Sequence, residues 1–443
     1  MTAITSSWLT SPHPSAVGGG RRLAWLDAMR GIAALCVVFD HLGYDVLQHA
    51  RHLVYQWFDP GTYGVFVFFL VSGYIVPASL ERKGSLRSFW VSRIFRLYPL
   101  YALVMGTAAG LKLAGLGSLR GAASAPEATA LGSALMLSNV LGVPNAVNVI
   151  WTLSYEMVFY LLLTALFVTG THRHSNRFAV GFAVAAVVLG GVLPQAALSG
   201  GVLGTRLVAV LADLLVGGGI ALAVTRRKLP KTAGAVLAGG TGILLLAVNG
   251  QWVEPWEALS ILALMFTGTM IYRAEHGQFG RRRAAAGAVA VFVLIIVAGL
   301  WWHSYSSGTP GAAELVWDRR MVTTLALAGI TFAAGLAWRH RKIPAILPWL
   351  GLVSYSVYLV HPLLIELYRD IPGTRGPHPF PVQMLLAAAF LLVLLGCCAL
   401  THRFVEVPMQ RQGRKLAARL GAWCGPGNPV PPPRSSPADV TAG

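Results

Sequence analysis

The sequence predicts an all-α, polytopic transmembrane helix bundle with about 10–12 spans and both ends in the cytoplasm. Of its 443 residues, only 12% are charged and 55% are hydrophobic, and the mean hydropathy is +0.61. An average soluble domain carries about 25% charged residues. The apolar residues also fall in blocks of ~18 or more, which is long enough to cross a bilayer as a helix. Together these observations exclude a soluble globular protein and predict a lipid bilayer around the chain.

About twelve apolar blocks are expected to form the spans. In chain order they lie at 31–47, 62–80, 97–116, 151–168, 178–198, 203–224, 232–248, 257–272, 284–302, 321–338, 345–367 and 381–400. A weaker stretch at 129–143 is interrupted by Gly132, Asn139 and Pro144. We expect this stretch to be a re-entrant or interfacial piece, because counting it as a span would move the later basic loops to the other side of the membrane.

The charged residues set the expected topology. There are 35 Lys and Arg against 17 Asp and Glu, which gives a formal net charge of +18. With the weak stretch excluded, the basic clusters fall on one side, at 21–22, 81–96, 172–177, 226–231, 281–283, 339–342 and 403–419. Cytoplasmic loops collect Lys and Arg, so the blocks at 31–47 and 345–367 should run outward and the block at 151–168 inward. The charge therefore indicates topology and not a nucleic-acid partner.

The two ends of the chain are expected to be disordered. Residues 1–20 are rich in Ser, Thr, Pro and Gly without an apolar core, so they do not resemble a cleavable signal peptide. A Pro-rich tail covers 421–443, which leaves 21–420 as one transmembrane domain. The cysteines have no metal-type spacing, so no metal site is predicted.

Ionisable residues inside the expected spans are costly, and three of them point to a functional site. His41 follows Arg30 by eleven residues, which is about 16 Å along a helix. Glu156 lies near the start of an inward span and His361 in an outward one. The three should reach a similar depth in the outer half, and a shared polar chamber explains this most simply. The structural alternatives are hydrogen-bonded packing for a histidine and a buried ion pair for Glu156.

Small and hydroxyl-bearing residues accompany these groups. Ser354, Tyr358 and His361 share one helical face. Ser72 and Gly73 lie in the middle of a span, where two small residues usually mark a close contact between helices.

Three arginines lie toward the expected cytoplasmic side. Arg93 and Arg96 are one turn apart near the start of a helix, and Arg30 lies at the mouth of the first span. Two guanidinium groups at this spacing can clamp a phosphorylated ligand with bidentate hydrogen bonds. Ordinary anchoring at the cytoplasmic surface would be a sufficient explanation if these residues stood alone.

Six short motifs appear in order over residues 26–408. They are LDAMRGIAA at 26–34 with His41, FFLVSGY at 68–74, RIFRLYP at 93–99, WTL at 151–153 with Glu156 and FY at 159–160, SYS at 354–356 with Tyr358 and HP at 361–362, and FVEVP at 404–408. The set resembles the acyltransferase-3 family of integral-membrane acyltransferases. Each motif alone is weak, but their order over nearly the whole chain is specific.

The resemblance implies an enzyme that transfers an acyl group, usually acetyl, from acyl-CoA to a hydroxyl of a sugar or another acceptor. It implies that His41 is the essential histidine, that Arg30 is its companion, and that Arg93 and Arg96 meet the CoA phosphates. Many family members carry an acidic residue where this chain has Phe66, so no role is carried over to that position. An envelope glycan or a glycosylated secondary metabolite is the expected acceptor.

The chemistry of acyl transfer assigns roles to the remaining groups. His41 would act as the base for the acceptor hydroxyl, while Glu156 would fix its tautomer or align the acceptor. Hydroxyl groups of the chamber would stabilise the oxyanion. The chamber residues are Ser72, Tyr355, Tyr358 and His361. Direct transfer in a ternary complex is favoured over an acyl-histidine relay.

Two other classes of function stay open. A proton-coupled secondary transporter or flippase would use the buried His and Glu as a proton relay. A membrane scaffold or sensor explains the spans but not the clustered polar residues. If the protein is an enzyme, we expect a multi-pass protein of the plasma membrane. Its expected partners are the lipid bilayer, acyl-CoA and a hydroxylated acceptor such as a sugar. A homo-oligomer is also left open.

Overall fold

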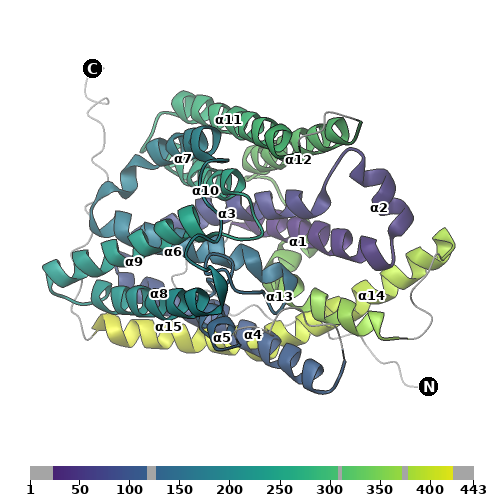
Figure 1. Cartoon of the computed structure of the whole chain (residues 1–443), viewed down its shortest axis with the longest axis horizontal. Coiled ribbons are helices and arrows are strands. Elements are labelled where there is room, and N and C mark those ends of the chain that lie inside the picture. Colours follow the sequence, from purple (N-terminus) through teal and green to yellow (C-terminus); the bar gives the residue numbers. More distant parts are fainter. Residues whose placement is uncertain (1–22, 117–125, 308–311, 372–377, 423–443) are drawn as a thin grey trace, which may run out of the picture.

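The computed structural model describes residues 23–116, 126–307, 312–371 and 378–422, and these residues form helices and connecting turns without a strand. Figure 1 shows α1 and α3 passing through the middle of the bundle, α11 and α12 along one edge, and α15 along the opposite edge. The N-terminal lead expected at 1–20 lies outside the described residues. The same is true of the Pro-rich tail from 423 onward.

The helices follow one another with short connections. In chain order they are α1 (Ala24–Asp45), α2 (Gln48–Tyr55), α3 (Pro60–Lys83), α4 (Leu86–Leu113), α5 (Pro126–Ala134), α6 (Trp151–Val168), α7 (Ser175–Leu189), α8 (Gly201–Ala223), α9 (Lys228–Asn249), α10 (Pro255–Glu275), α11 (Arg281–Ser307), α12 (Ala312–Ala337), α13 (Ile346–Arg369), α14 (Phe380–Thr401) and α15 (Val407–Ala422). Short 3₁₀ turns cover Asn148–Ile150 and Thr171–His174, and a π-helical turn covers His402–Glu406.

The predicted transmembrane helix bundle is confirmed. Each of the twelve expected blocks overlaps a helix of the structure, namely α1, α3, α4 and α6 to α14, although the block at 178–198 extends well past the end of α7. Within the described part of the chain, nine helices are long and apolar enough to cross a membrane, or ten if the bent pair of α1 and α2 is one span. Two expected spans are not among these candidates. Helix α7 has only 15 residues, which is shorter than the ~20 that a span needs, and α10, which holds the expected span at 257–272, is also not a candidate.

Helices α1 and α13 cross backbone to backbone at two glycines. A Cβ on Gly351 would lie 1.9 Å from the carbonyl oxygen of Asp27, and one on Gly31 would lie 2.9 Å from the nitrogen of Gly351. Ten residues further along each helix, the rings of His41 and His361 are in contact. The two helices therefore run in the same direction and in register, as the charge pattern predicts.

Helices α3 and α10 make a second crossing of this kind. A Cβ on Gly73 would lie 1.8 Å from the carbonyl oxygen of Met265, and one on Gly268 would lie 2.2 Å from that of Leu70. Thr269 also donates a hydrogen bond to the Gly73 carbonyl at 2.8 Å. Small residues let membrane helices approach closely and expose backbone groups to each other, so the close contact expected at Ser72 and Gly73 is present.

The weak stretch at 129–143 is not a span. It holds the end of the short α5 and then irregular turns, and its apolar side chains Leu137, Val140 and Leu141 are fully buried. Asn249 bonds the carbonyl of Val140 at 3.0 Å, and Gln251 donates its backbone N–H to the carbonyl of Asn139 at 3.0 Å. Irregular backbone is tolerated inside a membrane bundle only when its polar groups are satisfied by protein in this way.

Three of the basic clusters, at 81–96, 172–177 and 339–342, meet at one end of the bundle, which we call the basic end. Arg273 bonds both Glu81 and the carbonyl of His172, which joins the ends of α3, α6 and α10. Arg339 pairs with Glu275 at 2.6 Å, which adds the end of α12. These contacts agree with the prediction that the basic clusters share one side.

Replacing Gly351 with Ala should destabilise the bundle by about 1–3 kcal/mol, because the added Cβ would force α1 and α13 apart. Gly396 in α14 is the matched control, since a Cβ there meets nothing within 4 Å. Thermal unfolding of the two variants in one detergent measures the difference. Equal melting temperatures would contradict the close crossing.

Candidate active site

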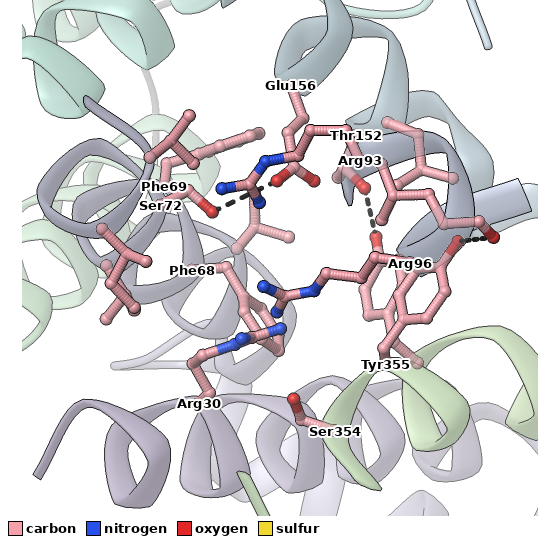
Figure 2. A pocket seen from close by; sticks show the side chains of 17 residues that line it. Arg30, Phe68, Phe69, Ser72, Arg93, Arg96, Thr152, Glu156, Ser354 and Tyr355 are labelled. Atoms are coloured by element: carbon pink, nitrogen blue, oxygen red, sulfur yellow. Dashed lines mark hydrogen bonds between the residues drawn. The ribbon is translucent and has the colours of Figure 1, made fainter. Parts of the chain in front are cut away.

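The first cavity of the site lies between α1, α3, α4, α6 and α13. We call it the arginine pocket. Its polar lining residues are Arg30, Ser72, Arg93, Arg96, Thr152, Glu156, Ser354, Tyr355 and Tyr358. Figure 2 shows the guanidinium groups of Arg30 and Arg96 facing each other from opposite walls, with Glu156 and Ser72 on the far side. The structure thus brings all three predicted arginines to one cavity.

Positive charge is in excess in this pocket. Glu156 accepts hydrogen bonds from Tyr160 and, at 3.5 Å, from Ser72, but among the described residues no arginine lies within 4.0 Å of its carboxylate. Arg93 is only 6% exposed, and its guanidinium carbon lies 5.2 Å from the centre of the Tyr160 ring. Three guanidinium groups against one carboxylate suit a ligand with several negative charges, because arginine recognises phosphate by paired hydrogen bonds.

Local sequence places these arginines on the pocket wall. Ser85 caps α4 by accepting a hydrogen bond from the Ser88 N–H at 3.4 Å, so the helix starts two turns before Arg93. The spacing of three residues then brings Arg96 onto an adjoining position of the same face. Tyr355 ties α13 to this wall with a hydrogen bond to the Leu97 carbonyl at 2.9 Å.

A second cavity lies at the other end of α1 and α13. We call it the histidine pocket. Its lining includes Asp40, His41, Tyr44, Asn145, Asn148, Val149, Trp252, Glu366 and Arg369. Arg369 is held by two hydrogen bonds to Asp45, at 2.9 and 2.8 Å, so its charge is compensated. This pocket therefore offers mixed polar groups and aromatic rings, in contrast to the cationic arginine pocket.

The two histidines form a hydrogen-bonded chain with a defined direction. Nδ1 of His361 lies 2.9 Å from the carbonyl oxygen of Val357, and a carbonyl can only accept, so this nitrogen carries the proton. Nε2 of a neutral His361 is then an acceptor, and it lies 2.8 Å from Nδ1 of His41. His41 must donate through Nδ1, which leaves its Nε2 with the free lone pair.

A single layer of side chains separates the two pockets. The hydroxyl groups of Thr152 and Tyr358 lie 2.7 Å apart, and both bond the carbonyl of Val149, at 3.2 and 2.9 Å. Thr152 and Tyr358 line the arginine pocket, whereas Val149 lines the histidine pocket. The buried His361 lies next to this layer, with its ring centre 6.2 Å from that of Tyr358.

The sequence analysis expected one chamber for His41, Glu156 and His361, and the structure differs. His361 contacts His41, but Glu156 lies in the arginine pocket with Ser72, and the partner of the His41 ring is another histidine. The reason is that α6 does not begin at a membrane surface. Residues 135–150 already lie inside the bundle, so Glu156 is displaced along the helix toward the arginines.

Two buried carboxylates were missed as parts of the site. Glu406, in the π-helical turn, accepts a hydrogen bond from Ser356 at 2.5 Å and so braces α13 from behind. Asp40 accepts one from Tyr55 at 2.5 Å and lines the same pocket as His41. The sequence signal that could have identified them is a single acidic residue among apolar neighbours. Within the described residues no group of three or more His, Cys, Asp or Glu side chains is arranged to hold a metal ion.

Comparison with known proteins decides the family. The family model described as an acyltransferase domain matches residues 23–402, which include every residue of both pockets named above. The chain belongs to the acyltransferase-3 family. The family resemblance drawn from the short motifs is thereby confirmed, and the chain carries an acyltransferase domain.

Curated members of the acyltransferase-3 family are similar to this chain at low identity. A putative peptidoglycan O-acetyltransferase of Bacillus subtilis (YrhL) is 22% identical over 90% of this chain and 56% of its own length. The peptidoglycan O-acetyltransferase OatA of Listeria monocytogenes is 23% identical over 88% of this chain and 56% of its own length. A putative O-acetyltransferase of Staphylococcus aureus is 27% identical over 37% of this chain and 27% of its own.

The chain spans about half the length of the first two of these relatives. No solved structure matches the chain.

The brace behind α13 can be tested by stability. Replacing Ser356 with Ala should cost about 1–3 kcal/mol, because the buried Glu406 loses a hydrogen-bond donor. Ser354→Ala is the control, since within the described part of the chain the Ser354 hydroxyl bonds only the Gly351 carbonyl of its own helix, at 2.9 Å. Thermal unfolding in detergent compares the two, and a control that is at least as destabilised as Ser356→Ala would contradict the bracing role.

Proposed function

We propose that this acyltransferase is a plasma-membrane O-acyltransferase that moves an acetyl or similar acyl group from acyl-CoA to a hydroxyl of a carbohydrate. The observation that carries the proposal is the pair of pockets. Among the described residues, no arginine of the cationic cavity forms an ion pair, and this cavity lies one side-chain layer away from His41, whose Nε2 has no hydrogen-bond partner in the same part of the chain. The donor would occupy the arginine pocket and the acceptor the histidine pocket.

The arginine pocket matches the chemistry of an acyl-CoA. Its guanidinium groups would bind phosphates, and excess positive charge in a site with little water strengthens such contacts. The opposite wall carries the apolar side chains of Phe68, Phe69 and Ile75, which would pack along an uncharged pantetheine arm. Arg30, Arg93 and Arg96 are accordingly proposed as donor-binding residues.

The histidine pocket matches the chemistry of a sugar. Trp252 is 68% exposed, so it presents an aromatic face on which a sugar ring can stack. Tyr44 is 54% exposed, and the Arg51 guanidinium covers one face of its ring, 3.6 Å from the ring centre. Asn145 and Asn148 add side-chain amides, which donate and accept hydrogen bonds with hydroxyl groups. The relatives named as peptidoglycan O-acetyltransferases support a glycan acceptor.

The proposed reaction is a direct transfer. Nε2 of His41 takes the proton of the acceptor hydroxyl as its oxygen bonds to the acyl carbon. The C–S bond of the thioester then breaks, and the thiolate leaves with the proton from His41 as free CoA. His361 accepts the Nδ1 hydrogen bond of His41 and would stabilise the transient imidazolium while fixing its orientation. Tyr358 lies on the path between the pockets. Its hydroxyl would turn from the Val149 carbonyl to donate its one proton to the oxyanion, while Thr152 keeps its bond to that carbonyl.

Glu156 takes a different role from the one expected from the sequence. Because it lies among the arginines, we propose that it orients them and limits the repulsion between their charges while the pocket is empty. Ser72 and Tyr355 support that arrangement through their bonds to Glu156 and to α4.

Replacing His41 with Gln should lower acyl transfer by about 10²–10⁴-fold, because the base is lost. Replacing His361 with Asn should lower kcat less and leave the affinity for acyl-CoA unchanged, because His361 only positions His41. The assay is transfer of labelled acetyl from acetyl-CoA to glycan fragments by purified protein in detergent. Normal transfer by His41→Gln would refute the assigned base, and proton-coupled uptake without release of CoA would favour a transporter.

Replacing Arg96 with Gln should raise the Kd for coenzyme A about tenfold or more, because one charge-assisted contact to phosphate is lost. Arg87→Gln is the control, since Arg87 lies on the same helix and bonds the Val224 carbonyl at 3.0 Å outside the pocket. Calorimetry with coenzyme A and with pantetheine separates phosphate binding from arm binding. Equal affinities of the two variants for coenzyme A would remove Arg96 from the donor site.

A further inference from the structure

A third cavity lies on the outside of the bundle and belongs to neither pocket of the proposed active site. It lies between α10, α11 and α12, with Leu70 of α3 at its floor. We call it the lateral groove. Its wall is formed mainly by small and apolar residues, for example Ala284, Ala288 and Ala333. Such a wall offers no hydrogen bonds to a sugar or a nucleotide.

The groove has the length and the opening that a lipid chain needs. Its lining runs along α11 from Arg281 to Ile296, a rise of about 22 Å, which exceeds half of a ~30 Å hydrocarbon core. Val289 and Ile330 on its rim are 64% and 62% exposed. Both flanking helices are candidate spans, so the groove opens sideways into the lipid.

The groove ends in positive charge at the basic end of the bundle. Arg281 and Arg339 line this end together with Glu275. The Glu275 carboxylate already has partners, because it pairs with Arg339 at 2.6 Å and accepts a hydrogen bond from Tyr74. Arg281 has no ion pair or hydrogen bond among the described residues. One arginine is therefore available to an anion at the point where the apolar lining stops.

Packing keeps the groove open. A Cβ on Gly329 would lie 2.7 Å from the ring of Phe292, so the backbone of α12 already rests on that ring and the helices cannot close further there. Alanines on both walls leave the remaining width unfilled.

We infer that the lateral groove is a binding site for an anionic phospholipid, with one acyl chain along α11 and its phosphate at Arg281. Anionic lipids are attracted to basic residues near the membrane surface by about 1 kcal/mol for each residue. Arg339, fixed by Glu275, borders the same headgroup position. The site is independent of the proposed transferase function, because α3 separates it from the arginine pocket.

The test uses the full-length protein in nanodiscs made of phosphatidylcholine and phosphatidylglycerol, with retained lipid counted by native mass spectrometry. The wild type should retain phosphatidylglycerol in preference to phosphatidylcholine. Arg281→Gln should reduce this preference about fivefold, whereas Arg282→Gln should not, because Arg282 does not line the groove. No preference in the wild type, or equal loss in both variants, would overturn the headgroup assignment.

A second pair of variants tests the part of the groove that would hold the acyl chain of the lipid. Ala285→Phe should fill the groove and abolish retained lipid of either kind, and Ala290→Phe should not, because Ala290 is an exposed residue of the same helix outside the lining. Ala285 and Ala290 are both exposed, so both variants should fold. Unchanged retention in Ala285→Phe would overturn the assignment of the groove.

Discussion

Both pockets depend on the contact between α1 and α13. The crossing at Gly31 and Gly351 has no room for a side chain, and it fixes the two helices in register over the ten residues that lead to His41 and His361. Arg30 and Ser354 line the arginine pocket near the crossing, and His41 lines the histidine pocket further along. A shift of either helix by one turn, about 5.4 Å, would break the histidine pair and misalign the two cavities.

The second constraint is the cost of polar groups inside a membrane. The structure satisfies most of these groups internally: Asn249 bonds the carbonyl of Val140, Glu406 accepts from Ser356, and Tyr358 bonds the carbonyl of Val149. The arginine pocket is different, because its positive charge exceeds its negative charge. Buried charge without a partner is costly, and a bound polyanion would remove that cost. The same contrast distinguishes the lateral groove, where Arg339 is paired with Glu275 and Arg281 has no ion pair among the residues that the structure describes.

Local features of the sequence predicted the helices and their directions. The apolar blocks are long enough to locate the spans, and the basic clusters gave α1 and α13 the same direction. The turn spacing of Arg93 and Arg96 predicted that they act together. Contacts between distant segments were not accessible, because nothing local pairs His41 with a residue 320 positions away. The depth of Glu156 was also misjudged, because residues 135–150 enter the bundle before α6 starts.

The central claim is that donor and acceptor meet across the layer formed by Tyr358, Thr152 and Val149. The most direct measurement is a structure of the protein with a non-transferable acyl-CoA analogue, in which the thioester sulfur is replaced by a methylene group. The account predicts phosphates on Arg30, Arg93 and Arg96, with the acyl carbonyl beside Tyr358 and directed toward His41. A ligand with its phosphates in the histidine pocket, or with its acyl group directed away from His41, would contradict it.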